Sequence, residues 1–320
     1  MAGSNIITLE GFCQTILAVM QKAYPDCRIE IHERVRNNGV HGKSLSIDNG
    51  FCSSSPEIPL DKFYRDYLDG QHLLAVCQAI TAYYEECRSH NDFPMKILKD
   101  YRQVEPMLCY GLINTEKNKA MLENTPHVHF LDLSIIFYIP IRVLKDRMDR
   151  IVVSKSMMED WGITDHPEDL YTAACKNTGK LFPGRVISAE EIQREAVLNR
   201  DEIDPDILKE VLSLSEVPDA RPLYAATNDK YIYGAAVILY DQLLKSFADE
   251  IKDDLVIIPS SVHECMLAPL SHANLARLKE MVVSMNHEMD EEDVLSDNIY
   301  LYNRATDQIG IIGDGEKGEA

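Results

Sequence analysis

The segment LVIIPSSVHECMLAP, residues 255–269, sets serine, histidine and glutamate side chains between two apolar runs. A serine nucleophile needs a base within hydrogen-bond reach, and Ser260, Ser261, His263 and Glu264 are the residue types that such a site uses. On an extended strand the side chains alternate, so Ser261 and His263 would share one face while Glu264 points to the other. Two interpretations stay open: a hydrolase site, or a Pro-Ser-Ser turn between strands whose hydroxyls satisfy free backbone groups.

Other patterns that could hold a metal or a cofactor are incomplete. The zinc-peptidase motif H-E-x-x-H fails after His263, because Leu267 stands where the second histidine is required. In HVHFLD, His127 and His129 fall on one face of a strand. Asp132 comes one residue too late for the H-x-H-x-D-H run of metallohydrolases, and no histidine follows it. The nucleophile elbow G-x-S-x-G and the phosphate-binding glycine motifs do not occur. We therefore expect no metal and no cofactor.

A strand-to-helix junction in INTEKNKAML carries a further polar group, formed by Asn114, Glu116 and Asn118. An asparagine or threonine at such a junction caps the helix, so capping by Asn114 or Thr115 explains the run without a ligand. Asn228, at the end of the strand expected in RPLYAATND, is a fourth candidate for ligand binding. Binding at these residues is the alternative to a purely structural role.

The 320 residues carry a net charge of −20, and the pI is about 4.9. A surface of this sign repels nucleic-acid phosphates and anionic membranes, so direct binding to either is not expected. An acidic protein can instead imitate nucleic acid, but imitation needs carboxylates arranged in rows. The acidic residues are scattered among lysines and arginines, apart from a dense run at residues 288–293. This distribution favours an ordinary soluble acidic protein over a mimic.

Cysteine spacing and the apolar runs indicate a cytoplasmic protein. The eight cysteines are spread along the chain without any C-x-x-C pair, so zinc sites of the finger type are not expected. The first residues show no signal peptide, and no apolar run approaches the ~18 residues that a membrane span requires. We therefore expect free thiols in a reducing cytoplasm, with no membrane partner.

The hydrophobic periodicity predicts an N-terminal region that contains a helix, a β-hairpin and two further helices. TLEGFCQTILAVMQKAY has apolar residues on one helical face, and Thr8 is the expected N-cap. The Asn38-Gly39 pair between two alternating runs is typical of a hairpin, because both residues tolerate positive φ. PLDKFYRDYLDG and HLLAVCQAITAYYEECRSH follow as helices. We place this region at residues 1–105.

Residues 106–312 are expected to form an α+β domain, in which helices pack on a mixed, mostly antiparallel sheet. HVHFLDLSIIFYIPI is predicted as one long central strand, and YGAAVILYDQLLKSFADEI as one helix. The polar helical segment at residues 188–220 is interpreted as an exposed connector. Residues 313–320 should form a disordered tail.

Several segments resemble an uncharacterised bacterial family, catalogued as the domain of unknown function numbered fifty-six eighty-eight. The resemblance covers nearly the whole chain, through INTEKNKAMLENTPHVHFLDLSIIFYIPI, MEDWGITDHPEDLYTAACKNTGKLFP, LYAATNDKYIYGAAVILYD, VIIPSSVHECMLAP and the N-terminal RNNGVHGKSLSI and SPEIPLDKFYRDYLDG. It implies an origin in anaerobic gut Gram-positive bacteria, often near mobile-element genes, but it implies no reaction. The family's Pro-Ser-Ser-Val-His-Glu segment corresponds to residues 259–264.

These observations leave three candidate functions. The failure of each catalytic motif and the acidic composition favour a non-enzymatic cytosolic protein that binds a protein partner, and the family resemblance implies a role in mobile-element biology. The alternative is a hydrolase that uses His263 with Ser260 or Ser261 and an acid from elsewhere in the chain. The third candidate is an acidic mimic of nucleic acid.

Overall fold

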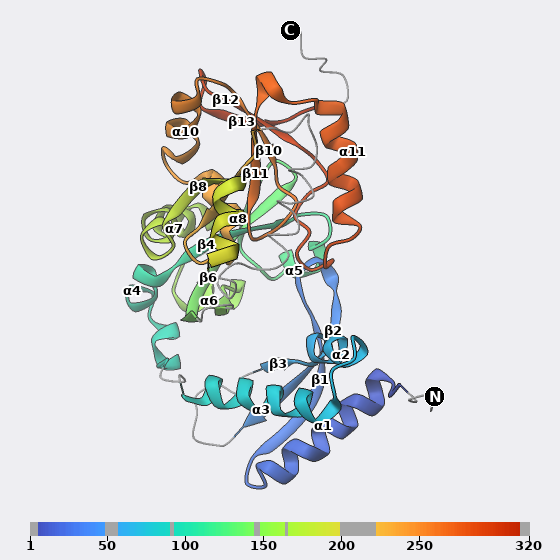
Figure 1. Cartoon of the computed structure of the whole chain (residues 1–320). Helices are drawn as coiled ribbons and strands as arrows, with labels where there is room; N and C mark the ends of the chain where they lie inside the picture. The colour runs from blue at the N-terminus through green and yellow to red at the C-terminus, as the bar shows by residue number, and fades with distance from the viewer. Residues whose placement is uncertain are drawn as a thin grey trace, which may run out of the picture. The chain divides into compact units, whose positions relative to one another are not determined.

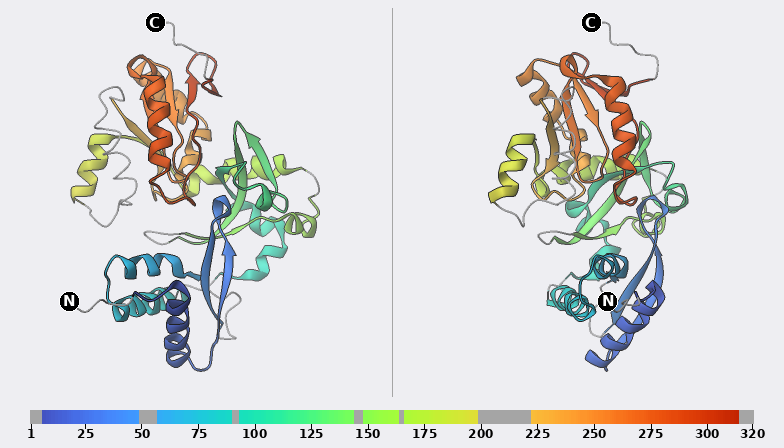
Figure 2. Two further views of the ribbon diagram at one scale, coloured as in Figure 1. Left: turned by 90° about the vertical axis from the view of Figure 1, so that its right-hand side faces the viewer. Right: turned by 45° about the vertical axis from the view of Figure 1, so that its right-hand side comes forward.

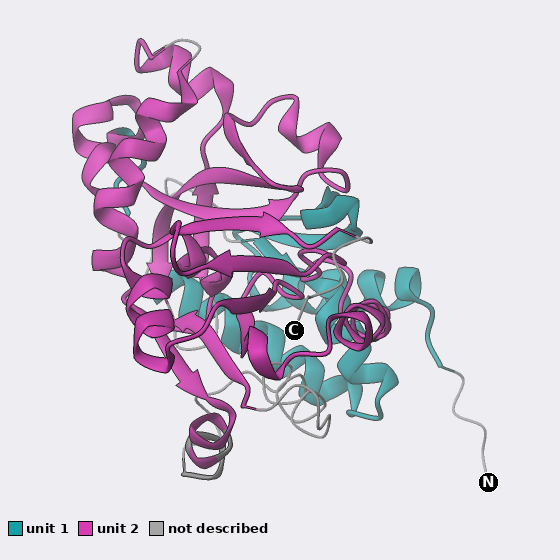
Figure 3. Cartoon of the chain, turned by 90° about the horizontal axis from the view of Figure 1, so that it is seen from above, with its two compact units in different colours: residues 1–96 teal, residues 97–320 magenta. Residues whose placement is uncertain are grey.

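The computed structural model describes residues 6–48, 57–89, 93–143, 148–163, 166–198 and 222–313. The chain divides into two compact units, Met1–Lys96 and Ile97–Ala320, which Figure 3 colours separately. All strand pairs in the described part of the chain are antiparallel, and helices pack on the sheets. The predicted α+β class is therefore confirmed. Among the described helices, none combines the length and the apolar character that crossing a membrane requires.

Unit 1 packs three helices on a three-stranded sheet of order β1-β2-β3 (Figure 1). Its elements are α1 (Leu9–Ala23), β1 (Arg28–Val35), β2 (His41–Asp48), β3 (Glu57–Pro59), α2 (Leu60–Leu68) and α3 (Leu73–Ser89). Their apolar faces form one core, in which Phe12, Leu45 and Ile80 are fully buried. The predicted N-cap is confirmed, because the Thr8 hydroxyl accepts a hydrogen bond from the Gly11 amide at 3.2 Å.

A tight connection at Asn37–Gly39 joins β1 to β2. Asn38 and Gly39 have φ angles of 58° and 72°, in the left-handed region. These two residue types adopt that region at low cost, which is why Asn-Gly marks the connection in the sequence. The two strands then pair along their full lengths.

Unit 2 contains two antiparallel sheets, which Figure 2 shows from two further sides. In the four-stranded sheet, β6 lies between β4 and β5, and β7 pairs further along β6; the six-stranded sheet has the order β13-β12-β10-β11-β9-β8. The strands are β4 (Cys109–Asn114), β5 (His127–Phe130), β6 (Leu133–Val143), β7 (Met148–Val152), β8 (Gly184–Ser188), β9 (Tyr224–Asn228), β10 (Leu255–Ile258), β11 (Cys265–Pro269), β12 (Tyr300–Asn303) and β13 (Gln308–Ile311). The helical elements after α3 are η2 (Met95–Lys99), α4 (Tyr101–Val104), η3 (Glu105–Met107), α5 (Lys119–Leu122), α6 (Lys155–Asp160), α7 (Pro167–Leu181), α8 (Ala189–Leu198), η5 (Gly234–Leu239), α10 (Leu243–Ile251), η6 (Leu270–His272) and α11 (Leu275–Asn286).

Helices cover both faces of the six-stranded sheet. On one face, Leu278 and Val282 of α11 pack against a core that includes Val256 of β10. On the other face, the Cys265 thiol of β11 lies 3.7 Å from the Ala235 carbonyl oxygen of η5. Figure 1 shows α10 and α11 on opposite sides of this sheet. Because both faces are covered, all four residues of β10 are buried, which explains its unbroken apolar sequence.

Two predicted elements are each divided in the structure. Residues 127–141, predicted as one strand, belong to β5 and β6, because the backbone turns at Leu131, which has a φ of 56°. Residues 233–251, predicted as one helix, hold η5 and α10, which are separated at Gln242, with a φ of 63°. Neither leucine nor glutamine favours the left-handed region, so no residue type marks these two breaks in the sequence.

The predicted connector and tail fall largely outside the described residues. The first part of the connector is α8, which is helical as predicted. Residues 199–220 of the connector and residues 314–320 of the tail lie beyond the described ranges. The helix expected after the strand-to-helix junction in INTEKNKAML is reduced to the four residues of α5, which follow a turn.

Candidate functional site

The loop between β10 and β11 contains the serine–histidine segment, residues 259–264. Its first half pairs with residues 293–296 through backbone hydrogen bonds. The Ser260 carbonyl accepts from the Leu295 amide at 2.7 Å, and the Val262 amide donates to the Asp293 carbonyl at 2.8 Å. This pairing fixes the loop against the acidic run and brings the Asp293 side chain beside the histidine of the segment.

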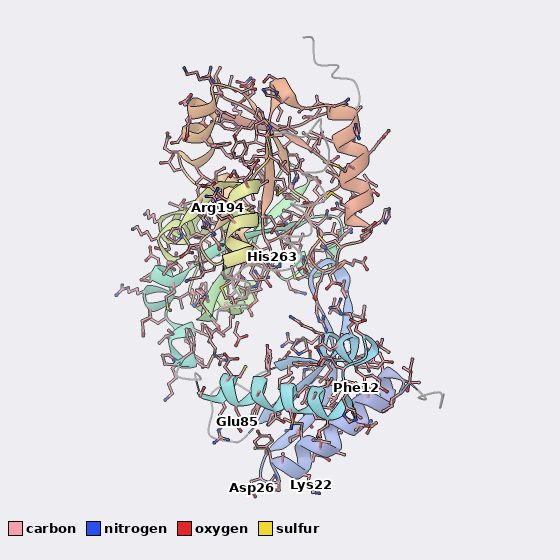
Figure 4. The ribbon with its side chains drawn as sticks, viewed as in Figure 1. Phe12, Lys22, Asp26, Glu85, Arg194 and His263 are labelled. Carbon is pink, nitrogen blue, oxygen red and sulfur yellow. The ribbon has the colours of Figure 1, made fainter. Side chains whose placement is uncertain are left out.

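Both ring nitrogens of His263, which Figure 4 labels, face a protein group. Nδ1 accepts a hydrogen bond from the Tyr233 backbone amide at 3.2 Å, and Nε2 lies 3.4 Å from Asp293 Oδ1. Because the amide is a donor, Nδ1 supplies the lone pair, so the neutral ring carries its proton on Nε2, toward the carboxylate. The side chains of His263 and Asp293 are 21% and 28% exposed, so the pair is accessible from solvent.

The predicted serines lie beside His263, but the hydrogen bond that Ser261 makes is to the backbone. The Ser261 hydroxyl oxygen accepts from the His263 amide at 3.0 Å. Ser260 and Glu264 are buried, at 0% and 1% exposure. The structure thus brings Ser261, His263 and an acid together. The acid next to the ring is Asp293, and the Ser261 hydroxyl is engaged by the His263 backbone amide, while the imidazole faces the Tyr233 amide and the Asp293 carboxylate.

A strained loop, residues 228–234, presents the amide that binds the imidazole. Asn228, one of the predicted binding residues, shapes the loop from inside. Its Nδ2 donates to the Ile232 carbonyl at 2.8 Å, and its Oδ1 accepts from two loop amides. Tyr231 and Tyr233 then adopt φ angles of 55° and 51°. A non-glycine residue there costs roughly 1–2 kcal/mol, and such strain is concentrated at functional sites.

Arg150, on β7, stacks on this loop. Its guanidinium carbon lies 3.6 Å from the ring centre of Tyr233 and 5.1 Å from that of Tyr138. The Tyr233 ring centre is in turn 5.5 Å from that of His263. A cation over an aromatic face is attracted by the negative charge density of the ring. We call the four side chains Arg150, Tyr138, Tyr233 and His263 the Arg150 cluster.

Burial keeps the Tyr138 hydroxyl of the Arg150 cluster uncharged. It raises the pKa of the Tyr138 hydroxyl well above its ordinary value of 10.0, although the charge of Arg150 acts in the opposite direction. Burial also raises the pKa of the neighbouring Cys109 thiol to about 12. Removal from water disfavours the charged form of both groups. Within the stacked pair of Arg150 and Tyr138, the charge is therefore the positive charge of Arg150.

The other predicted binding residues take part in local structure. Asn114 Oδ1 accepts from an amide in its own turn, and its Nδ2 donates to the Leu295 carbonyl, both at 2.9 Å. Asn118 is buried and donates to the Asn114 carbonyl at 2.9 Å. Glu116 is exposed and pairs with Lys119. These bonds explain the polar run without a ligand, and a binding role for it stays a prediction.

The HVHFLD segment separates its histidines from its aspartate. His127 and His129 share a face of β5, with ring centres 5.1 Å apart. Asp132 lies in the turn after β5. Its carboxylate accepts hydrogen bonds from three side chains, at 2.6, 3.0 and 2.6 Å: Ser296, Asn298 and Tyr300. This carboxylate ties the four-stranded sheet to the segment that leads into β12. In the described ranges, no three His, Cys, Asp or Glu side chains are placed to hold a metal ion.

Four members of the site were missed by the reasoning from sequence. Arg150, Tyr138 and Tyr233 belong to no motif, and Arg150 meets Tyr233 only because β7 and the loop after β9 lie together in the fold. Asp293 was noted only as part of the acidic run at residues 288–293. The one signal that could have located the loop is Gly234, which directly follows Tyr233, because a glycine can mark a close approach of the backbone.

A sequence model of DUF5688, a family of unknown function, matches residues 9–304. The chain therefore belongs to this family, which confirms the resemblance. Comparisons with curated proteins and with solved structures found no match. The family description names no activity, so the geometry of the Arg150 cluster must carry the argument for function.

Proposed function

We propose that this chain is a non-enzymatic protein that acts by binding a protein partner, and that the partner binds around Tyr233 and His263. The observation that carries the proposal is the engagement of both ring nitrogens of His263. Nδ1 accepts from the Tyr233 amide and Nε2 carries the proton toward Asp293, so no lone pair is left to activate a nucleophile. The strained backbone of residues 228–234 supports the same location, because such strain is retained where it serves a function.

The hydrolase alternative gains one supporting feature, the Asp293 carboxylate beside His263. It would require the Tyr233 amide to leave Nδ1 and a serine hydroxyl to take its place. A fluorophosphonate probe that labels activated serines tests it, with His263→Ala as the comparison. We expect no labelling in either protein. Labelling of Ser260 or Ser261 that disappears in His263→Ala would establish the hydrolase instead.

Mimicry of nucleic acid is the third proposal, and it draws on the net charge of −20. The acidic run at residues 288–293 gives it limited support, because Asp293 faces His263 and so does not join a row of carboxylates aimed outward. For the setting, we propose the cytoplasm of a bacterium and an association with mobile elements. The acidic composition supports the cytoplasmic part of that setting, and the family resemblance described above implies the rest.

Capture from an extract of the source organism tests the binding proposal. The tagged full chain is compared with Tyr233→Asn, which removes the ring while asparagine still tolerates a left-handed backbone. Val35→Ser, at a side chain of unit 1 that is 60% exposed, is the matched control. We expect one reproducible partner with wild type and Val35→Ser, and roughly ten-fold less of it with Tyr233→Asn, as for an aromatic anchor. Equal recovery with Tyr233→Asn, or no reproducible partner, would contradict the proposal.

A further inference from the structure

We propose that Arg150 is a carboxylate-binding residue, and that the Arg150 cluster receives a carboxylate group of the ligand. The inference rests on the proposed binding function and specifies the chemistry that the site recognises. Three observations carry it: the free edge of the Arg150 guanidinium, the rigid surface beneath it, and the charge of the chain.

The hydrogen-bond donors of Arg150 are not used by the described residues. The side chain is half-buried, and its contacts are the faces of Tyr138 and Tyr233. A guanidinium that stacks by its face keeps its five N–H donors pointing outward in its own plane. No ion pair or hydrogen bond joins these donors to another described residue. Arg142, on the strand next to β7, has by contrast an ion pair with Asp149 at 2.9 Å.

Arg150 is partly removed from water, and no described carboxylate lies beside it to offset the loss of hydration. Burial of a charge costs free energy unless hydrogen bonds or an opposite charge offset it. A ligand anion in the plane of the guanidinium would supply both. The site is therefore electrostatically prepared for an anion that the described part of the chain does not provide.

The surface beneath Arg150 is held in place before any ligand arrives. Tyr233 is held by the hydrogen bond from its amide to His263 Nδ1, and the backbone at Gly234 is packed so closely that a Cβ atom there would collide with backbone atoms of Asn228 and His263. The Tyr138 ring below is 2% exposed and sits in the core. A preformed site loses less conformational freedom on binding, which raises its affinity.

The charge of the chain favours a carboxylate over a phosphate. A carboxylate is planar and matches the guanidinium fork with two parallel hydrogen bonds. The chain carries a net charge of −20, and Asp293 lies beside His263, so each further negative charge on the ligand adds repulsion. A singly charged carboxylate keeps the attraction to Arg150 and suffers the smallest repulsion. Its source is either an acidic group of a protein partner or a small organic acid.

Thermal unfolding of the full chain in acetate, in inorganic phosphate and in chloride, at equal ionic strength, tests the proposal. Arg150→Gln removes the charge, and Arg150→Lys keeps it without the planar fork. Arg185→Gln is the matched control. The Arg185 guanidinium carbon lies 4.7 Å from the ring centre of Tyr231, a tyrosine whose backbone is also left-handed. Unlike Arg150, however, Arg185 already donates a hydrogen bond to the Tyr231 hydroxyl. A fourth arm uses an acidic peptide with a free C-terminal carboxylate and the same peptide with every carboxyl amidated.

We expect acetate to raise the unfolding midpoint saturably, by roughly 2–4 °C over chloride, in wild type and Arg185→Gln. The rise should be lost in Arg150→Gln and at least halved in Arg150→Lys, which serves as the test if Arg150→Gln does not fold. Tighter binding of the free-acid peptide than of acetate identifies a protein partner as the source, and equal binding identifies a small acid. The proposal is overturned by an equal acetate effect in both Arg150 variants, by no saturable effect in wild type, or by a larger effect of phosphate.

The two proposals fail in different ways. If a partner is captured through Tyr233 but acetate binding does not depend on Arg150, the binding function stands and the carboxylate site falls. If acetate binds through Arg150 but no partner is recovered, the site stands and the ligand is a small acid.

Discussion

Gly234 is the residue on which the strained loop depends most directly. A Cβ atom at this position would lie 2.9 Å from the Asn228 nitrogen, and closer still to the Thr227 hydroxyl and the His263 carbonyl. Two of these neighbours are backbone atoms and cannot rotate away. We expect Gly234→Ala to lower the free energy of unfolding by about 2–3 kcal/mol. Urea unfolding measures the loss, with Gly310→Ala as the control, because a Cβ there meets nothing within 4 Å and should cost less than about 0.5 kcal/mol. Equal losses of unfolding free energy in the two variants would show that the backbone of the loop shifts to make room for the added Cβ atom.

The hydrogen bond between the Tyr233 amide and His263 Nδ1 can be weighed by two substitutions. Asparagine at position 263 places its Oδ1 near the position of Nδ1 and can still accept from the amide, whereas alanine cannot. We expect His263→Ala to lose about 1–2 kcal/mol of unfolding free energy and His263→Asn to keep about half of that amount. Denaturant titrations of both variants check this difference. If the two lose the same amount, this hydrogen bond does not stabilise the loop.

Single residues could be predicted where the physical cause is local. Thr8 and the Asn38-Gly39 pair act on their own neighbours in the chain, and the structure places them as expected. His263 was also chosen from its residue type. Its partners Tyr233 and Asp293 lie thirty residues away on either side, and only the folded chain brings them to the ring. Residue types therefore indicated the histidine of the site but not the groups that decide its chemistry.

At the scale of elements, the turn between β5 and β6 is the clearest test of the backbone. Leu131 has a φ of 56° and its side chain is 38% exposed. The packing of this side chain therefore offsets little of the free energy that its left-handed backbone costs. We expect Leu131→Gly to leave the free energy of unfolding unchanged or to raise it by up to about 1 kcal/mol. Leu74→Gly is the matched control, because Leu74 is 62% exposed within helix α3, and glycine there should cost about 1 kcal/mol. A loss at Leu131 as large as the loss at Leu74 would mean that the turn carries no strain.

The same turn shows why element boundaries were harder to predict than elements. Most predicted strands and helices of unit 2 are present, since their apolar patterns reflect burial. The breaks at Leu131 and Gln242 are set by tertiary contacts instead. At the first break, Asp132 accepts three hydrogen bonds from residues 296–300, which hold the turn from across the unit. A local pattern carries no information about such distant partners.

At the scale of the whole molecule, composition and periodicity were enough to predict the α+β class. Each unit has a core of its own, and that of unit 1 is built from residues between Phe12 and Tyr84. The acidic net charge describes the surface as a whole and gave no hint of a local positive site. The positively charged Arg150 stacks on the Tyr233 ring within a chain whose net charge is −20. The sequence alone does not place this cation beside the ring, because the contact forms only in the fold.

Buried ionisable groups make the stability of unit 2 sensitive to alkaline pH. Burial raises the pKa of Cys109 from 9.0 to about 12, so the folded thiol stays neutral where the unfolded thiol ionises. The stabilisation is complete below about pH 9 and is lost as the pH rises toward 12, at up to about 1.4 kcal/mol per pH unit. The pKa of Tyr138 is raised well above its ordinary value of 10.0, so its ionisation in the unfolded chain lowers the free energy of unfolding further above about pH 10.

Urea unfolding of wild type and Cys109→Ser between about pH 8 and about pH 10 separates the thiol from the tyrosines, because serine does not ionise in this window. We expect the free energy of unfolding of the wild type to fall more steeply with pH than that of Cys109→Ser. The slope, and not the absolute stability, is the readout, since loss of the buried sulfur lowers the stability of the variant at every pH. Parallel profiles would mean that the Cys109 thiol titrates alike in the folded and unfolded chain, and that burial does not control its charge.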